Sequence, residues 1–259
     1  NGAGNSYDFA AAVKCTSNGD VFVTGGAFHT LVNLNAVTIR YNSSGTAQWT
    51  QTWDNVSLSD AGGTLAFAGS ETRVIVTGFT QTNASTWEYM ALTYAVSSGT
   101  LAASTVTTLG GTSIDRISDA VTDASGNIYI TGTLGATGQG LDMKTVKLDV
   151  NLNILWTATW NGAANLDDVA NGIVVDASGN VYVAGSSTLL GNTTDAVLIK
   201  YTSGGTASWV ETYDGGGPDA FADVPWQGTG RYTALQEQDK ERGQSKTIVR
   251  PAPAARHQQ

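Results

Sequence analysis

The sequence predicts an all-β protein built from four similar units in tandem. Three observations support this prediction: a repeat with a period of 53 or 54 residues, a glycine-rich and charge-poor composition, and short runs of β-branched and aromatic residues bounded by turn residues. A fixed period of this size indicates an array of similar supersecondary units. We therefore expect the repeat to set the architecture of the whole chain.

Each unit contains a turn, a strand and a closing Thr-Gly or Ala-Gly pair. The four copies read NGDVFVTG, ETRVIVTG, SGNIYITG and SGNVYVAG. Their closing glycines are Gly25, Gly78, Gly132 and Gly185, spaced by 53, 54 and 53 residues. The 31 glycines, 4 prolines and 14% charged residues are typical of short strands joined by tight turns.

The fourth unit shows the strands most clearly. We expect them within 168–176, 180–186, 195–201 and 207–213, because each run is short, rich in β-branched or aromatic residues, and bounded by Gly, Asn, Asp or Ser. Four strands in such a unit make one blade of a β-propeller. The prediction is thus a β-propeller with about four four-stranded blades of ~53 residues.

Aromatic residues recur in the fourth strand of the units. Residues four apart on a strand share a face, so we expect the recurring tryptophans to pack between blades rather than to form a ligand platform. The second unit has Ala103 and Thr107 at these two positions and lacks the Gly-Asn turn, so the repeat specifies its blade least. The aromatic pairs are Trp49 with Trp53, Trp156 with Trp160, and Trp209 with Tyr213.

The period also divides the chain. The repeats occupy 1–224, with units at about 1–53, 54–107, 108–160 and 161–213 and a partial fifth at 214–224. Closed propellers have about 4–8 blades. We therefore expect an incomplete propeller, an open arc cut from a larger ring, and a chain excised from a longer one.

Residues 225–259 form a polar, basic tail in which the repeat stops. Its composition favours disorder. Three interpretations remain open: an unstructured end, a cationic tether to an anionic surface, and the product of a reading-frame change or gene fusion.

A family resemblance follows from three elements that recur in order. DASGNVYVAG, DAVLIKY and GTASW resemble the bacterial β-propeller repeat called SBBP, whose name refers to a seven-bladed propeller. The resemblance covers about residues 1–224. It implies a secreted or cell-surface bacterial protein, often multidomain, and it carries over no catalytic motif.

Composition limits the partners. The net charge of −9 disfavours nucleic acid, because an acidic body repels phosphates. Cys15 is the only cysteine, which excludes an internal disulfide and a cysteine-rich metal site. No apolar run approaches the roughly 18 residues that span a membrane. We expect no cofactor and no metal.

Residues that suggest chemistry mostly have a structural interpretation. The DASGN loops at 123–127 and 176–180 are interpreted as hairpin turns rather than calcium loops, because the ligand spacing of an EF-hand is missing. His29 is expected in a surface loop without a catalytic partner. Carboxylates recur 17 residues before the closing glycines, with Asp60 displaced by one, and at the start of the third strands. A glycosidase would need two of them ~5–9.5 Å apart, but residues repeated in every blade favour a structural role. The recurring carboxylates are Asp8, Asp60, Asp115, Asp168, Glu88, Asp142 and Asp195.

Loops that differ between units are the better candidates for binding. These are 80–89, 134–141 and 186–194, since variable loops on one rim of a repeat protein commonly form its binding face. The first contains Trp87, Glu88 and Tyr89, which we predict as candidate binding residues. Trp87 can stack on a sugar or peptide, or pack beneath its own loop.

Three functional hypotheses result. The first is a non-catalytic extracellular or cell-surface scaffold that presents its loops to a protein or glycan partner. The second is a propeller-type hydrolase or lyase with a site at the channel mouth. The third is a truncated fragment without independent activity. The absence of a catalytic motif favours the first hypothesis.

Overall fold

The computed structural model describes residues 7–29, 33–56, 58–83, 86–107, 116–135, 140–191, 193–215, 217–221, 231–235 and 247–251. For the last two ranges only the backbone is described. Every regular element in these ranges is a β-strand. The all-β prediction is confirmed.

Four antiparallel sheets of four strands account for most of the described chain, and each is called a blade. Within a blade the strands lie in chain order, so each strand pairs with the next. Blades 1 and 2 consist of β1 (Asp8–Cys15), β2 (Val21–Phe28), β3 (Leu34–Tyr41), β4 (Ala47–Trp53), β5 (Asp60–Ala68), β6 (Arg73–Gln81), β7 (Trp87–Ala95) and β8 (Leu101–Thr107). Blades 3 and 4 consist of β9 (Arg116–Thr122), β10 (Ile128–Gly135), β11 (Leu141–Leu148), β12 (Ile154–Trp160), β13 (Asp168–Val175), β14 (Val181–Thr188), β15 (Thr194–Tyr201) and β16 (Ala207–Tyr213).

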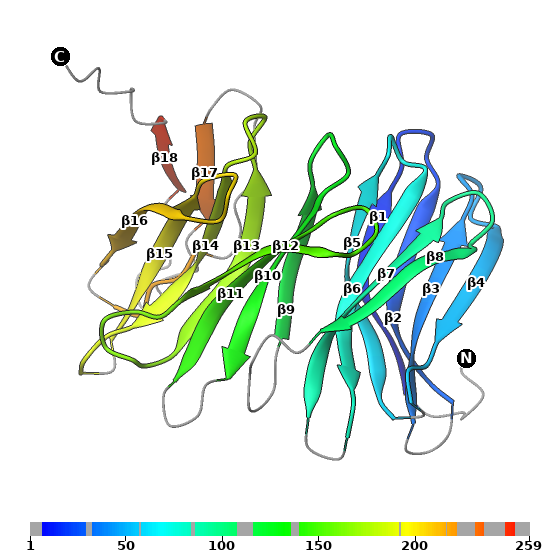
Figure 1. Ribbon diagram of the computed structural model, residues 1–259, viewed down its shortest axis with the longest axis horizontal. Helices are drawn as coiled ribbons and strands as arrows, with labels where there is room; N and C mark the ends of the chain where they lie inside the picture. The colour runs from blue at the N-terminus through cyan, green and yellow to red at the C-terminus, as the bar shows by residue number, and fades with distance from the viewer. Residues whose placement is uncertain are drawn as a thin grey trace.

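Consecutive blades pack face to face, and together they form an open arc (Figure 1). The first strand of a blade lies against the preceding blade: β5 packs on β1 to β3, β9 on β5 and β6, and β13 on β9 to β11. Blade 1, in blue, and blade 4, in yellow, are at opposite ends of the arc. No closed sheet joins them within the described residues, so the predicted incomplete propeller is confirmed.

The DASGN sequences form the turns that their composition predicts. Asp123 accepts hydrogen bonds from the backbone N–H groups of Ser125 and Asn127, both at 2.9 Å, while Gly126 takes a left-handed φ of 83°. Partial burial alone would raise the pKa of Asp123. Hydrogen bonds from Asn127 and Tyr129 outweigh that effect, so the pKa of this carboxyl is held below its ordinary value. Asp176 has the same arrangement in blade 4.

The closing glycine of each unit is required by a close approach of the backbone. A Cβ at Gly25, Gly78, Gly132 or Gly185 would lie 2.0 Å from a carbonyl oxygen of the neighbouring first strand. The pairing register shifts at these points, which is the signature of a β-bulge. The bulge brings the first strand so near that only a residue without a side chain fits. The strongest signal of the repeat thus has a steric cause.

Two of the fourth-strand tryptophans, Trp49 and Trp156, pack between blades. Trp156 of blade 3 lies with its ring centroid 6.2 Å from Tyr129 and 6.4 Å from Tyr201 of blade 4. Its indole N–H donates to the carbonyl of Ser203 at 3.0 Å, and Gly205 lies so close that a Cβ there would be 2.7 Å from the ring. Trp49 repeats this packing against blade 2, where Gly99 takes the place of Gly205. The prediction that these tryptophans are packing residues is confirmed.

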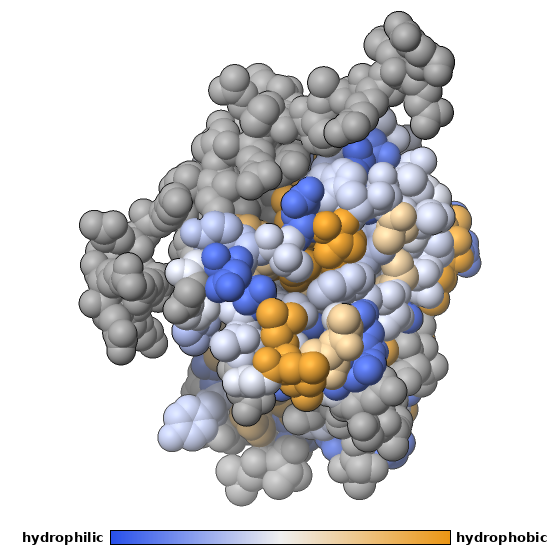
Figure 2. Space-filling view, turned by 90° about the vertical axis from the view of Figure 1, so that its left-hand side faces the viewer, coloured by the Kyte–Doolittle hydropathy of each residue, from blue (hydrophilic) through white to orange (hydrophobic). Residues whose placement is uncertain are grey.

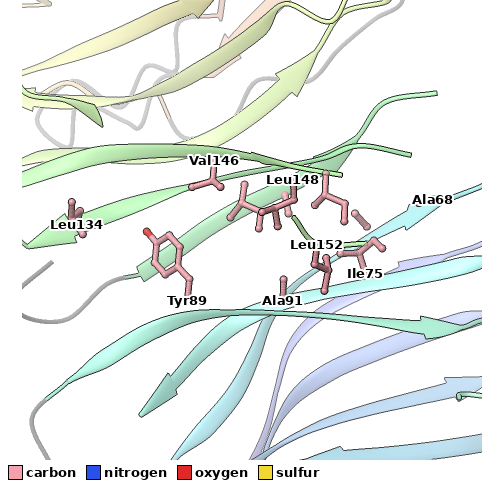
Figure 3. Close-up of a cluster of buried hydrophobic side chains, with 12 residues drawn as sticks. Ala68, Ile75, Tyr89, Ala91, Leu134, Val146, Leu148 and Leu152 are labelled. Atoms are coloured by element: carbon pink, nitrogen blue, oxygen red, sulfur yellow. The ribbon is translucent and has the colours of Figure 1, made fainter. Parts of the chain in front are cut away.

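Blade 2 forms a complete four-stranded sheet although it lacks the tryptophan. Leu152, in the turn of blade 3 at the position of Gly99 and Gly205, is buried in the apolar cluster on which Ala103 packs. Figure 3 shows Leu152 beside Ile75 and Ala91 of blade 2. Leu152 keeps the left-handed backbone of the glycines, with a φ of 69°. A leucine side chain from the next blade therefore fills the space of the missing indole ring.

The partial fifth unit continues the arc as far as the structure describes it. Phe221 is buried against blade 4, and its backbone N–H donates to the carbonyl of Gly185 at 3.1 Å. In the predicted tail, β17 (Arg231–Leu235) and β18 (Thr247–Pro251) pair with each other as a two-stranded antiparallel sheet. Residues 222–230, 236–246 and 252–259, on which the rest of the prediction of disorder depends, lie outside the described residues.

Candidate functional site at the uncovered face of blade 1

The three residues predicted as loop binding residues all lie in strand β7. The Trp87 ring packs edge-on against Phe79, with 5.1 Å between the ring centroids, and Glu88 accepts a hydrogen bond from Thr82 at 3.3 Å. Tyr89 is only 2% exposed, and its hydroxyl donates to the Arg116 carbonyl of blade 3 at 3.0 Å. Tyr89 therefore joins blades 2 and 3, while Trp87 and Glu88 remain accessible where the strand begins.

The recurring first-strand aspartates bind the chain's own backbone. The donor is a backbone N–H, two residues after the end of the preceding blade's fourth strand. Asn55 donates to the Asp60 carboxylate at 3.1 Å, and Gly162 donates to the Asp168 carboxylate at 2.5 Å. Both carboxyls are fully buried. Asp8 accepts from the backbone N–H of Phe28, and Asp115 lies outside the described residues. Asp60 and Asp168 thus fix the segment that links two blades, whereas Asp8 binds within blade 1.

Carboxyls of neighbouring blades meet at these junctions. Burial raises the pKa of Asp168, and the negative charge of Asp142 in blade 3 raises it further. Burial likewise raises the pKa of Asp195, with further contributions from Asp214 and Asp219. Buried carboxyls with raised pKa values, which we call the junction carboxyls, are Asp60, Asp142, Asp168 and Asp195.

The junction carboxyls should make the fold more stable in mild acid than at neutral pH. Their pKa values in the folded state exceed the ordinary 3.8, so their favourable contribution is complete below that value and is lost as pH rises through the folded pKa. Carboxyls of lowered pKa, such as Asp123, lose their contribution as pH falls below 3.8. Thermal unfolding followed by circular dichroism should therefore show a maximum of Tm in mild acid.

Two substitutions test this pH dependence. Asp168→Asn keeps an oxygen acceptor for the N–H of Gly162 but cannot ionise, so the decline of Tm between mild acid and pH 7 should become shallower. Asp123→Asn should instead weaken the loss of stability in strong acid. A decline toward neutral pH that is unchanged in Asp168→Asn would contradict the assignment.

Among the described residues, no other blade covers the face of blade 1 that points away from blade 2. In blade 4 the equivalent positions Ile173, Val183 and Ile199 are 0–1% exposed, because blade 3 lies on them. In blade 1, Val13 at the position of Ile173 is 66% exposed, and Ile39 at the position of Ile199 is partly exposed. An exposed apolar surface of this kind is a candidate interaction site.

This face is hollowed. A depression of about 650 Å³ opens over β1, β2, β3 and β4. Its lining includes the apolar or aromatic residues Phe9, Val37 and Tyr41 and the polar residues Asp8 and His29. The exposed position of His29 agrees with its sequence interpretation, and the structure adds that it borders this hollow.

Sequence reasoning missed this face as a candidate site. The signal was the alignment of Val13, Val23, Val37 and Ile39 with residues buried between blades in the other units.

Within the described ranges, no three His, Cys, Asp or Glu side chains gather closely enough to hold one metal ion. The part of the chain that the structure describes contains no helix long and apolar enough to cross a bilayer.

Comparison with known proteins agrees with the geometry. The family described as "Beta-propeller repeat" (SBBP) matches residues 162–188, which span the start of blade 4. Residues 162–188 therefore resemble an SBBP repeat, and the described chain has a β-propeller fold. No curated protein sequence matches it.

Solved propellers resemble this chain in fold alone. The β-propeller domain of the trilobed protease from Pyrococcus furiosus superimposes with a TM-score of 0.59 at 7% identity, covering 96% of this chain and 71% of that one. Pyrococcus horikoshii acylaminoacyl peptidase gives 0.55 at 7% identity, with 94% and 38% covered. The Neurospora crassa Pan2 WD40 domain gives 0.52 at 11% identity, with 87% and 72% covered. These proteins include peptidases and a WD40 domain, so the likeness indicates no activity.

Proposed function

We propose that this chain is a non-catalytic binding scaffold that contacts a protein partner through the uncovered face of blade 1. The exposure of Val13, compared with complete burial of its equivalent Ile173, is the observation that carries the proposal. Burying apolar area stabilises a complex by roughly 25 cal/mol per Å² before the costs of association. A shallow hollow lined by valine, isoleucine and aromatic side chains suits an apolar protein side chain better than a glycan.

The non-catalytic part of the proposal rests on the junction carboxyls. Asp142 and Asp168 meet at the junction of blades 3 and 4, and Asp195 and Asp219 meet at the next position of the arc. A pair that serves catalysis is needed once, whereas this pair recurs. Asp168 is also fully buried, so a glycosidic substrate has no access to it.

We further propose a secreted or cell-surface location, which the resemblance of the sequence to SBBP repeats supports. Fractionation of the source cells, with detection of the chain by an antibody, tests this location. Recovery with cytoplasmic markers only would contradict it.

Peptides selected from a random display library on the purified chain test the binding face. Ile39→Glu places a charge in the lining of the hollow and should weaken the binding of the selected peptides by about tenfold or more, measured as Kd by fluorescence anisotropy. Val210→Glu, at an exposed valine of blade 4, is the matched control and should leave Kd unchanged. Val13→Glu, at a far more exposed position, provides a second variant if Ile39→Glu fails to fold.

The same selection separates the face from the predicted rim. Trp87→Ala removes the partly exposed aromatic side chain at the start of β7 while keeping the strand. Binders that resist Ile39→Glu but are lost with Trp87→Ala would overturn the blade 1 proposal in favour of the rim.

A further inference from the structure

We propose that the junction of blades 3 and 4 contains a calcium site formed by Asp142, Asp168 and Ser187. Both blades lie inside the described chain, so the inference is independent of the binding role proposed for blade 1. The site combines two carboxylates with a hydroxyl. It therefore differs from a cluster of three His, Cys, Asp or Glu side chains, which the described residues do not form.

Three strands of two blades bring these residues together. Asp142 is the second residue of β11, and β11 packs on β13, which begins at Asp168. The residues that precede them are bonded to each other, since the Leu141 N–H donates to the Asp167 carboxylate at 2.9 Å. Ser187 lies opposite Asp168 in the pairing of β13 with β14. Because the three residues come from separate strands, no sequence motif predicts the site.

The described residues give the oxygen atoms of this site few hydrogen-bond donors. Asp142 is 7% exposed, and its Oδ1 is buried and accepts no hydrogen bond. Asp168 is fully buried; one oxygen accepts from the Gly162 N–H, and Oδ1 lies beside the Ser187 hydroxyl. A Cβ placed on Gly162 would lie 2.6 Å from Ser187 Oγ and 2.9 Å from Asp168 Oδ1, so both oxygens face one point. Buried carboxylates of this kind need a proton or a cation to balance them.

Lys144 does not supply the full balance. It acts on Asp142 from two positions along β11, and its ammonium donates to the Thr159 hydroxyl at 2.8 Å. Burial outweighs this attraction, so the pKa of Asp142 stays above its ordinary value. The two carboxyls therefore retain uncompensated negative charge whenever both are ionised.

The junction of blades 1 and 2 provides an internal comparison. The equivalents are Asn35 for Asp142, Asp60 for Asp168 and Thr80 for Ser187. Asn35 Oδ1 is also buried and has no hydrogen-bond partner. An amide thus replaces one of the two carboxylates. We therefore expect a divalent ion at the junction of blades 3 and 4 rather than here.

The donor atoms favour Ca²⁺ over other ions. Every side-chain donor is an oxygen, which favours hard cations over those that prefer nitrogen or sulfur. Ca²⁺ accepts about six to eight oxygens in a flexible geometry, whereas Mg²⁺ demands a near-ideal octahedron and keeps several waters. Two carboxylates also balance the charge of a divalent ion.

Other carboxyls lie beyond blade 4 rather than in this site. Asp195 stands opposite Ser187 in the pairing of β14 with β15. Burial raises the pKa of Asp195, and the charges that add to this effect are those of Asp214 and Asp219. Asp195 thus belongs to the next position of the arc, at the end that Figure 2 shows, where hydrophilic and apolar residues both reach the surface.

Titration of the full chain with CaCl2 at neutral pH, after a chelator has removed bound metal, tests the site by isothermal titration calorimetry. The native chain should bind one Ca²⁺, and an excess of about a hundredfold over Kd should raise Tm by about 5 °C or more. Asp142→Asn copies the junction of blades 1 and 2 and should raise Kd by about tenfold or more. Glu211→Gln, the same change at an exposed position of β16, is the matched control and should leave Kd unchanged.

The reverse substitution completes the test. Asn35→Asp gives the junction of blades 1 and 2 its second carboxylate and should raise the stoichiometry from one ion to two. It also keeps the proposal testable if Asp142→Asn fails to fold. A native chain whose Tm does not respond to about 10 mM CaCl2 would overturn the proposal. So would Ca²⁺ binding that Asp142→Asn leaves unchanged, because the ion would then lie elsewhere on the acidic surface. Neither result affects the peptide test at blade 1.

Discussion

Replacing Gly132 by alanine is expected to lower the free energy of unfolding by about 3 kcal/mol or more, a magnitude at the upper end for single substitutions. The new Cβ would lie 2.0 Å from the Arg116 carbonyl oxygen and 2.4 Å from the Tyr89 hydroxyl oxygen. Neither atom can retreat easily. The carbonyl belongs to the strand beyond the bulge, and the hydroxyl joins blades 2 and 3. Urea unfolding followed by tryptophan fluorescence measures the change.

Gly204→Ala is the matched control for this substitution. Gly204 lies in a turn of blade 4, and the nearest atom to its added Cβ is the Thr202 hydroxyl oxygen at 3.9 Å. Its effect should stay within about 0.5 kcal/mol. If the two alanine variants lose similar stability, close approach is not the reason for the glycine at the end of each unit.

Combining Ala103→Trp with Leu152→Gly should give the junction of blades 2 and 3 the tryptophan-on-glycine packing of the other junctions. Leu152→Gly alone opens a cavity that costs about 3 kcal/mol, offset by about 1 kcal/mol because leucine is strained at positive φ. Ala103→Trp alone drives a ring into the space that Leu152 fills and should cost about 1–3 kcal/mol. Combined, they recreate the tryptophan over glycine seen at Trp156 and Gly205.

A double-mutant cycle measures this compensation. The double variant should be more stable than the sum of the single effects by about 1–3 kcal/mol, since the residues share one cluster. The Leu152→Gly change paired with Val210→Glu is the control, in which the effects should add. Additivity of the Ala103 and Leu152 changes would show that the leucine does not replace the missing ring.

Sequence patterns predicted the strands and the arc because their causes are local or repeat in every unit. The glycine of the bulge, the DASGN turns and the fourth-strand tryptophans recur at fixed spacing, so each marks a place in the blade. The packing role of Leu152 could not be predicted from its own unit, because the space that it fills belongs to Ala103 in the preceding unit. A leucine at a glycine position suggests only a less well conserved turn. The structure shows that the small side chain of Ala103 leaves room for it.

The candidate site was harder to predict than the fold. Trp87 attracted attention as an exception to the repeat, although β7 begins at that residue and packs it against Phe79. The uncovered face of blade 1 contains ordinary repeat residues such as Val13 and Ile39. Their side chains are typical of a core, and they are exposed because no described blade lies on this face. Such a site depends on whether a neighbouring blade covers the face, and no sequence motif records that.

The pairing of Trp49 with Gly99, and of Ala103 with Leu152, has a consequence for building new arrays from this chain. Each pair spans two blades, so a segment excised at unit ends such as Trp53 separates residues that were fitted to each other. Cutting within the blades, for example from Ala47 to Gly99, keeps a ring together with the glycine beneath it. The transferable module is the interface between two blades rather than the blade itself.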